Sequence, residues 1–350
     1  MRCYASSVQC LSKIVPPSPY RSSWPRSGGD AEGAREPAVL VLSSLPGFDV
    51  LNGKLEGPLI TDGRHSDKRS PLSVEELPEG SLVIADLGFW SVARFSQIAR
   101  PGQGGKRRRY FLSRWQPGTK LRRRNGAEIV LRGILPKQVG ERIEFGAVLG
   151  EQRLPVRVCI ERVPREVGDQ RREDIRERAQ DHGHKPSEEV LYLADWTIVI
   201  TNLPRRLVSF DEVLILLRLR WQIERLFRLW KEHGHLEDSR SKKPWRILTE
   251  IYAKLAAMVI QQWLLHEGCW QDPHRSLFKA AQVVRREANL IMRALYKGGL
   301  EEVLSDILSY MRSGCQMETR RQRPNTSQFL MGEPHRWPVR KELAARSVLT

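Results

Sequence analysis

The chain has 350 residues, 40% of them hydrophobic, which is enough to build a sizeable core in one large domain or two modest ones. Its net charge of +17 favours a polyanionic partner, nucleic acid first, over a basic surface that binds nothing. The lack of an uncharged apolar run of about 18 residues excludes a transmembrane helix. Five scattered cysteines without zinc-site spacing favour a reduced cytosolic compartment.

The first hundred residues divide into two parts. Residues 1–36 are rich in Pro, Ser, Gly and Arg and show no persistent period, so we expect poor order there. Residues 37–100 predict the first half of an α/β core. A strand is expected at 38–42, a hairpin at 51–60, a strand buried on both faces at 81–86, and a helix at 91–99.

Residues 101–168 predict a β-rich insertion. The strand candidates are 110–115, 120–124, 128–135, 142–149 and 156–163. Asn125-Gly126 is a strong signal for a tight turn between two of them. The insertion carries two basic runs, 106–109 and 122–124, which fit solvated hairpin tips and contacts with a phosphate backbone about equally well.

Residues 169–235 predict a charged surface helix at 170–180, a buried strand at 195–201, and then a long helix. Ser209 and Glu212 form a capping box that starts this helix, which should end near Gly234. Residues 236–312 predict C-terminal helices at 245–265, 276–294 and 300–311, and residues 313–350 a basic tail.

The helix that follows the capping box carries the most informative pattern in the chain. Arg220 precedes Glu224 by four positions and Lys231 follows it by seven, so the three side chains share one helix face. An apolar stripe runs beside them. This is what a metal-ligating acid in a phosphate-handling site requires, whereas the simpler alternative is a surface acid paired with neighbouring arginines.

A second carboxylate, Asp86, lies at the end of the buried strand at 81–86, although capping that strand end is an alternative role. Acids at strand ends and on helix faces of an α/β sheet converge. Such acids can hold two Mg²⁺ or Mn²⁺ ions about 4 Å apart, which activate a nucleophile and stabilise a leaving oxygen. Arg220 and Lys231 would then clamp phosphates.

These residues resemble a known family. Arg220, Trp221, Ile223, Glu224, Phe227 and Lys231 are similar to the tyrosine-arginine-glutamate-lysine signature of bacterial insertion-sequence transposases, in the IS-four group of the DDE superfamily. The resemblance covers about residues 50–330. It includes, in family order, Thr61-Asp62-Gly63-Arg64, Ile84-Ala85-Asp86-Leu87-Gly88-Phe89, Ala194-Asp195-Trp196, Ser239-Arg240-Ser241-Lys242-Lys243-Pro244-Trp245 and Tyr252-Ala253-Lys254.

The resemblance implies an α/β fold, with an RNase H-like mixed sheet flanked by helices, an all-β insertion and a C-terminal helical region. It implies metal-dependent cleavage and transfer of DNA strands at transposon ends, with double-stranded DNA as partner, a homodimer as the active form and a place at the bacterial nucleoid. Asp86 would be the second acid and Glu224 the third, both ligating metal, while Arg220 and Lys231 would contact the DNA end. Leu217 replaces the signature tyrosine.

The first acid of the family pattern has no clear counterpart. By the position of Trp24-Pro25, it should fall near residues 9–12, but no carboxylate precedes Asp30. The possible substitutes are Asp30, Asp49, Asp62 and Asp67. The sequence therefore suggests a truncated or decayed transposase with an incomplete two-metal site. The alternatives are a non-catalytic DNA-binding remnant and an RNase H-like nuclease.

Overall fold

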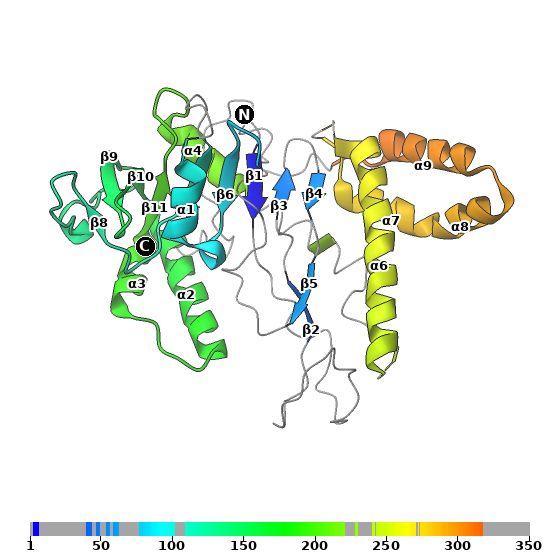
Figure 1. Cartoon of the computed structure of the whole chain (residues 1–350), viewed down its shortest axis with the longest axis horizontal. Helices are drawn as coiled ribbons and strands as arrows, with labels where there is room; N and C mark the ends of the chain where they lie inside the picture. The colour runs from blue at the N-terminus through cyan, green and yellow to red at the C-terminus, as the bar shows by residue number, and fades with distance from the viewer. Residues whose placement is uncertain are drawn as a thin grey trace, which may run out of the picture.

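The residues that the computed structural model describes are 3–6, 40–43, 47–49, 54–56, 59–62, 77–101, 109–220, 228–229, 240–241, 243–270, 272 and 274–317, with the backbone alone for the strands before residue 77. In these residues, nine strands form one mixed sheet (Figure 1). Their order is β4 (Lys54–Glu56), β3 (Gly47–Asp49), β1 (Cys3–Ser6), β6 (Leu82–Ala85), β7 (Tyr110–Arg114), β11 (Trp196–Thr201), β10 (Leu154–Arg162), β9 (Arg142–Leu149) and β8 (Leu121–Arg122).

The centre of the sheet is parallel and its flanks are antiparallel. β6 pairs in parallel with β1 on one side and with β7 on the other. All other neighbouring strands of this sheet run antiparallel. A separate antiparallel pair joins β2 (Leu40–Ser43) to β5 (Leu59–Asp62). This mixed sheet with flanking helices confirms the predicted α/β class.

All four residues of β6 are buried, because helices cover both faces of the sheet at this point. Leu82 and Ile84 belong to one hydrophobic cluster, whereas Val83 and Ala85 belong to the cluster on the opposite face. This alternation follows from the two-residue period of a strand. The prediction of a strand buried on both faces is therefore confirmed.

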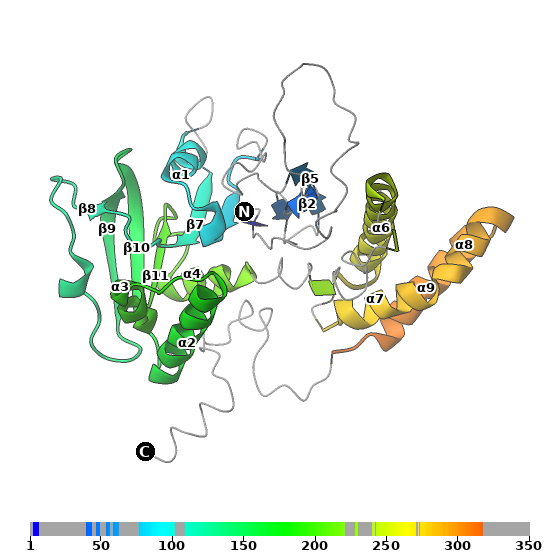
Figure 2. The ribbon, with the colours of Figure 1, turned by 90° about the horizontal axis from the view of Figure 1, so that it is seen from below.

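Helix α1 (Val92–Ala99) covers one face and connects the parallel strands β6 and β7. Figure 2 shows α1 on one side of the sheet, with α2 (Arg165–Asp181) and α4 (Phe210–Leu219) on the other. The Phe95 ring of α1 stacks on Phe111 of β7, with ring centroids 4.7 Å apart. On the opposite face, Val213 and Leu217 of α4 are buried in the same cluster as Leu82.

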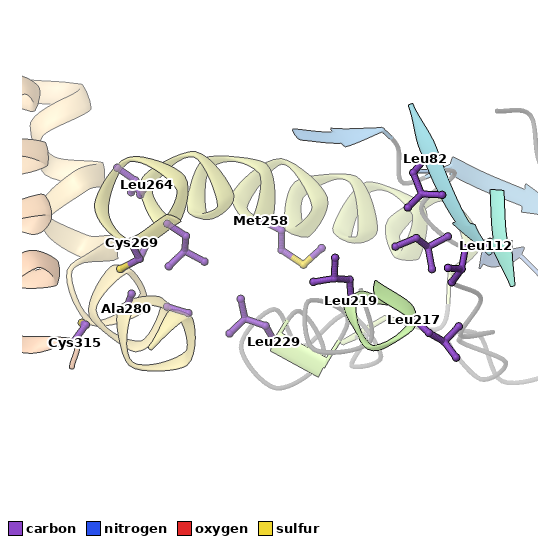
Figure 3. Close-up of a cluster of buried hydrophobic side chains, with 14 of the residues drawn as sticks. Leu82, Leu112, Leu217, Leu219, Leu229, Met258, Leu264, Cys269, Ala280 and Cys315 are labelled. Carbon is purple, nitrogen blue, oxygen red and sulfur yellow. The ribbon is translucent and has the colours of Figure 1, made fainter. Parts of the chain in front are cut away.

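The C-terminal helices extend the cluster on the α4 side. They are α6 (Pro244–Leu265), α7 (Leu277–Arg286), α8 (Ala288–Lys297) and α9 (Leu300–Gly314), with a π-helical turn (His266–Trp270) after α6. Figure 3 shows buried side chains continuing from Leu82 through Leu219 of α4 to Met258 of α6, and on to Ala280 of α7. One continuous apolar cluster thus joins the sheet to the helical region. No described helix is long and apolar enough to cross a membrane.

Several elements differ from the sequence prediction. Residues 3–6, in a segment expected to be poorly ordered, form β1 in the middle of the sheet. The sequence predicts a strand at 128–135, but Leu131–Gly133 form a 3₁₀ turn, and Leu135, two residues after it, is buried. The helix predicted at 276–294 is divided near Glu287 into α7 and α8.

The sheet also crosses the boundary predicted at residue 101. β7 was assigned to the β-rich insertion, yet it pairs with β6 in the parallel centre of the sheet. β8 to β11 then continue the same sheet beyond β7. The tight turn at Asn125-Gly126 is present: the Gly126 backbone has φ +91°, and the Ala127 carbonyl accepts a hydrogen bond from the Arg123 N–H at 2.7 Å.

Candidate active site at the end of strand β6

Asp86 directly follows β6, at the end where the parallel strands β1, β6 and β7 finish. Its carboxylate caps a 3₁₀ turn (Leu87–Phe89), in which Oδ1 accepts a hydrogen bond from the Leu87 N–H at 2.7 Å. The Asp86 side chain is 29% exposed. Open α/β sheets bind ligands in the crevice beyond the carboxyl ends of their parallel strands, so Asp86 occupies a favourable position for a functional group.

Arg220 reaches this carboxylate from the end of α4. The capping box predicted at Ser209 is present, with the Glu212 N–H donating to Ser209 Oγ and the Ser209 N–H donating to Glu212 Oε2. The helix that starts there ends at Leu219, and Arg220 is its C-cap residue, ten positions after Phe210. Arg220 Nη1 donates to Asp86 Oδ2 at 3.0 Å, and the Arg220 side chain is only 8% exposed.

The structure therefore joins two of the predicted site residues across 134 positions of sequence. Glu224 and Lys231, the other two, lie outside the described residues, as do Asp30 and Asp67. The sequence placed Arg220 beside Glu224 on one helix face, and it contained no signal for the ion pair with Asp86. Such a pair depends on how α4 is laid over the sheet.

The strand beside β6 holds no acid. β1 has the sequence Cys3-Tyr4-Ala5-Ser6, and Ser6 pairs in register with Ala85, one position before Asp86. Residues 9–12, near which the first acid was expected, lie outside the described residues. Neither β1 nor β7, the two strands that pair with β6, contains a carboxylate.

The remaining described acids on this side are poor substitutes. Asp49 of β3 pairs with Tyr4, which pairs with Val83, so it lies two strands and three register rows from Asp86. With about 4.8 Å between strands and about 3.3 Å per residue, the two backbones are roughly 14 Å apart. Asp62 lies in the separate β2–β5 pair. The position of Asp49 therefore does not suit two metal ions about 4 Å apart that must also be bound by Asp86.

The described residues do not form a ready metal site. Among them, no three His, Cys, Asp or Glu side chains gather where they could hold a metal ion. Asp86 offers the hard oxygen ligands that Mg²⁺ and Mn²⁺ prefer. Both of its oxygens, however, already accept hydrogen bonds, one from Leu87 and one from Arg220.

Asp195 has a structural role in the described fold. Its Oδ1 accepts a hydrogen bond from Arg172 Nη1 at 2.5 Å, and Arg172 also binds Asp169. A Cβ atom at Gly168 would lie 2.2 Å from Asp195 Oδ1, so only glycine allows this approach. These contacts fasten α2 to the start of β11.

Other arginines of α2, α4 and β7 are affected by burial or by their position in the sheet. Burial lowers the pKa of Arg218, in the last turn of α4, below its ordinary value. Burial, and then the charge of Arg114, lower the pKa of Arg171 to about 9. Arg114 follows Ser113, the register partner of Ala85, so it stands level with Asp86 on the neighbouring strand. Arg220 and Arg114 are thus two cations at this end of the sheet.

Comparison with known proteins identifies the family. Residues 47–260, which include Asp86 and Arg220, match the family described as "Transposase DDE domain". The chain belongs to this family of DDE transposases.

Three relatives show the extent of the similarity. The transposase for insertion sequence element IS231F of Bacillus thuringiensis subsp. israelensis is 27% identical over 257 residues, covering 68% of this chain and 51% of the relative. That for IS231E of Bacillus thuringiensis subsp. finitimus is 26% identical, covering 81% and 62%. That for IS1151 of Clostridium perfringens is 21% identical, covering 71% and 54%. The chain thus spans between about half and three fifths of the length of these relatives.

Proposed function

We propose that this chain acts on DNA as a DDE-type transposase, whose chemistry is metal-dependent cleavage and transfer of DNA strands at transposon ends. The observation that carries this proposal is the Asp86–Arg220 pair at the ends of the parallel strands, inside the segment that matches the family. A carboxylate for a metal ion and a guanidinium for a phosphate belong together in such a site.

The proposed roles follow the family pattern. Asp86 and Glu224 are the proposed catalytic acids and metal ligands, with Mg²⁺ or Mn²⁺ as the ion, which would supply Lewis-acid stabilisation of a phosphodiester. Arg220 and Lys231 are the proposed contacts to the phosphates of the DNA end. Double-stranded DNA, as transposon ends and as target, is the substrate, and work on bacterial DNA would place the protein at the nucleoid in the cytoplasm.

A homodimer is part of the proposal. α6 leaves Trp245, Tyr252 and Trp263 more than half exposed, and their spacings of 7 and 11 residues put them on one helix face. Large exposed apolar residues in one stripe favour contact with a protein surface. A second copy of this chain is the proposed occupant, and the mass of the purified chain measured by light scattering at several concentrations tests it.

A second candidate function is favoured by β1, whose four residues include no carboxylate. In this alternative the chain binds DNA but cleaves it extremely slowly, because one of three metal ligands is missing. The loss of a ligand that bridges two ions should lower the rate by several powers of ten. An RNase H-like nuclease without transposon ends as substrate has no specific observation in its favour.

The decisive experiment measures binding and nicking by the full chain on duplexes from the DNA that flanks its gene, with Mn²⁺ present. We expect the chain to bind these duplexes, and a duplex of random sequence to be a poor competitor. Nicking that Asp86→Asn abolishes supports the enzyme, and binding without nicking supports the second candidate. Asp181→Asn, an exposed carboxylate at the end of α2, is the matched control. A chain that binds no DNA would overturn both candidates.

A further inference from the structure

Asp86 and Arg220 form an ion pair in which both oxygens of the carboxylate already accept a hydrogen bond. Asp86 Oδ2 accepts from Arg220 Nη1 at 3.0 Å, and Asp86 Oδ1 accepts from the Leu87 N–H at 2.7 Å. Arg220 is almost fully buried, with its side chain 8% exposed, and a buried guanidinium needs a counter-charge. The carboxylate is therefore partly neutralised by an internal cation.

Both proposed ligands of this site must compete with that pair. A divalent ion needs the Asp86 oxygen that Arg220 now holds, and the positive charge of Arg220 repels any cation placed beside it. A DNA phosphate needs the Arg220 guanidinium, which the negative charge of Asp86 now occupies. A DNA phosphate that binds Arg220 would free Asp86 for the metal ion. A metal ion that binds Asp86 would free Arg220 for a DNA phosphate.

We propose that the Asp86–Arg220 pair is an internal lock that couples metal binding to DNA binding. Without DNA, Arg220 stands in the place of a metal ion and weakens metal binding at Asp86. A bound phosphate turns Arg220 towards DNA and frees the carboxylate. This inference rests on the proposed function, because it takes DNA and a divalent ion as the ligands of this site.

The coupling must be reciprocal. If DNA raises the affinity for the metal by some factor, the metal raises the affinity for DNA by the same factor. Couplings of this kind commonly range from about 5-fold to about 150-fold. An ordinary structural ion pair, in contrast, would not make the metal affinity without DNA depend on Arg220.

The test titrates Mn²⁺ into the full chain by calorimetry, with and without a DNA duplex of about 20 base pairs. In the wild type, we expect the duplex to raise Mn²⁺ affinity by about 5-fold to 150-fold. In Arg220→Gln, we expect Mn²⁺ to bind that much more tightly without DNA, and the duplex to add little. The double variant Asp86→Asn/Arg220→Gln should not show the tighter Mn²⁺ binding of Arg220→Gln, because it lacks the Asp86 carboxylate that would bind the ion.

The matched control is Arg172→Gln, which frees Asp195 from its arginine in the same way on the far side of α2. Its Mn²⁺ affinity should equal that of the wild type. A complementary variant, Asp86→Asn, frees Arg220, so its affinity for the duplex without metal should rise. This arm keeps the test valid if Arg220→Gln does not fold, which a thermal melt would reveal.

The outcomes separate the two proposals. If the wild type binds DNA and Mn²⁺ with no effect of one on the other, or if Arg172→Gln gains as much as Arg220→Gln, the lock is wrong and the proposed function stands. If the wild type binds no DNA under any condition, the proposed function is wrong and the lock falls with it.

Discussion

At the scale of single residues, the contact between Asp86 and Arg220 is the feature that the sequence did not reveal. The sequence identified each residue as part of a site, one from its place after a buried strand and the other from its spacing to Glu224. Their contact joins a strand end to the last turn of a helix 134 residues later. Local period and composition determine each element but not the angle at which α4 crosses the sheet. The contact between Asp86 and Arg220 could therefore not be predicted from the sequence.

Gly168 gives a prediction at the same scale. Alanine there would place Cβ 2.2 Å from Asp195 Oδ1, which is held in turn by Arg172. Asp195 must move, and the hydrogen bond between two charged groups is lost, so Gly168→Ala should lower the free energy of unfolding by about 1.5–3 kcal/mol. Urea denaturation followed by circular dichroism measures the change.

Gly133→Ala is the control, because a Cβ at Gly133 meets no atom within 4 Å. Its effect should stay within about 0.5 kcal/mol. In the double variant Gly168→Ala/Asp195→Ala the clash disappears. The two single effects should therefore not add, and strict additivity would show that the close approach of Gly168 to Asp195 is unimportant.

At the scale of elements, the capping box at the start of α4 is the clearest case of a local signal that determines local structure. Ser209 and Glu212 predicted the start of the helix, and both reciprocal hydrogen bonds are present. Sequence patterns whose structure depends on tertiary packing gave less accurate predictions. The apolar pattern at 128–135 suggested a strand, although Leu131–Gly133 turn so that Leu135 reaches the core.

Ser209→Ala should destabilise the protein, because it removes the side chain that caps the N–H of Glu212. The expected loss is about 1 kcal/mol in the free energy of unfolding near neutral pH. Ser305→Ala, at an exposed position inside α9, is the matched control and should be neutral or slightly stabilising. A loss of equal size in both variants would contradict the capping role.

The effect of Ser209→Ala should also depend on pH. Hydrogen bonds from the Ser209 backbone and side chain lower the pKa of Glu212 below 4.5. A carboxylate whose pKa is depressed by folding contributes stability above its unfolded pKa, and this contribution is lost as pH falls through the folded pKa. The gap between wild type and variant should therefore narrow below pH 4.5. Melting curves across the acid range measure it.

At the scale of the whole molecule, the net charge of +17 makes the proposed DNA binding a salt-dependent process. Each phosphate neutralised by a cation contributes about 0.9 to the slope of log affinity against log salt concentration. If Lys231 contacts one phosphate, Lys231→Gln should reduce that slope by about 0.9. Fluorescence anisotropy with a labelled duplex, at several salt concentrations, measures the slope.

Arg176→Gln removes one positive charge from the exposed surface of α2 and serves as the control. It should leave the slope unchanged. An equal decrease in both variants would mean that general surface charge, and not a contact made by Lys231, sets the salt dependence.

The way in which β11 covers β7 has a consequence for the newly made chain. Leu112 of β7 pairs with Thr201 of β11, so during synthesis this edge of β7 stays unpaired until almost ninety more residues have been made. Until then its backbone N–H and C=O groups, and the apolar side chains of Phe111 and Leu112, form an open sheet edge that invites pairing with other chains. A product cut between residues 116 and 195 would keep that edge permanently, and self-association in the cell would be its fate.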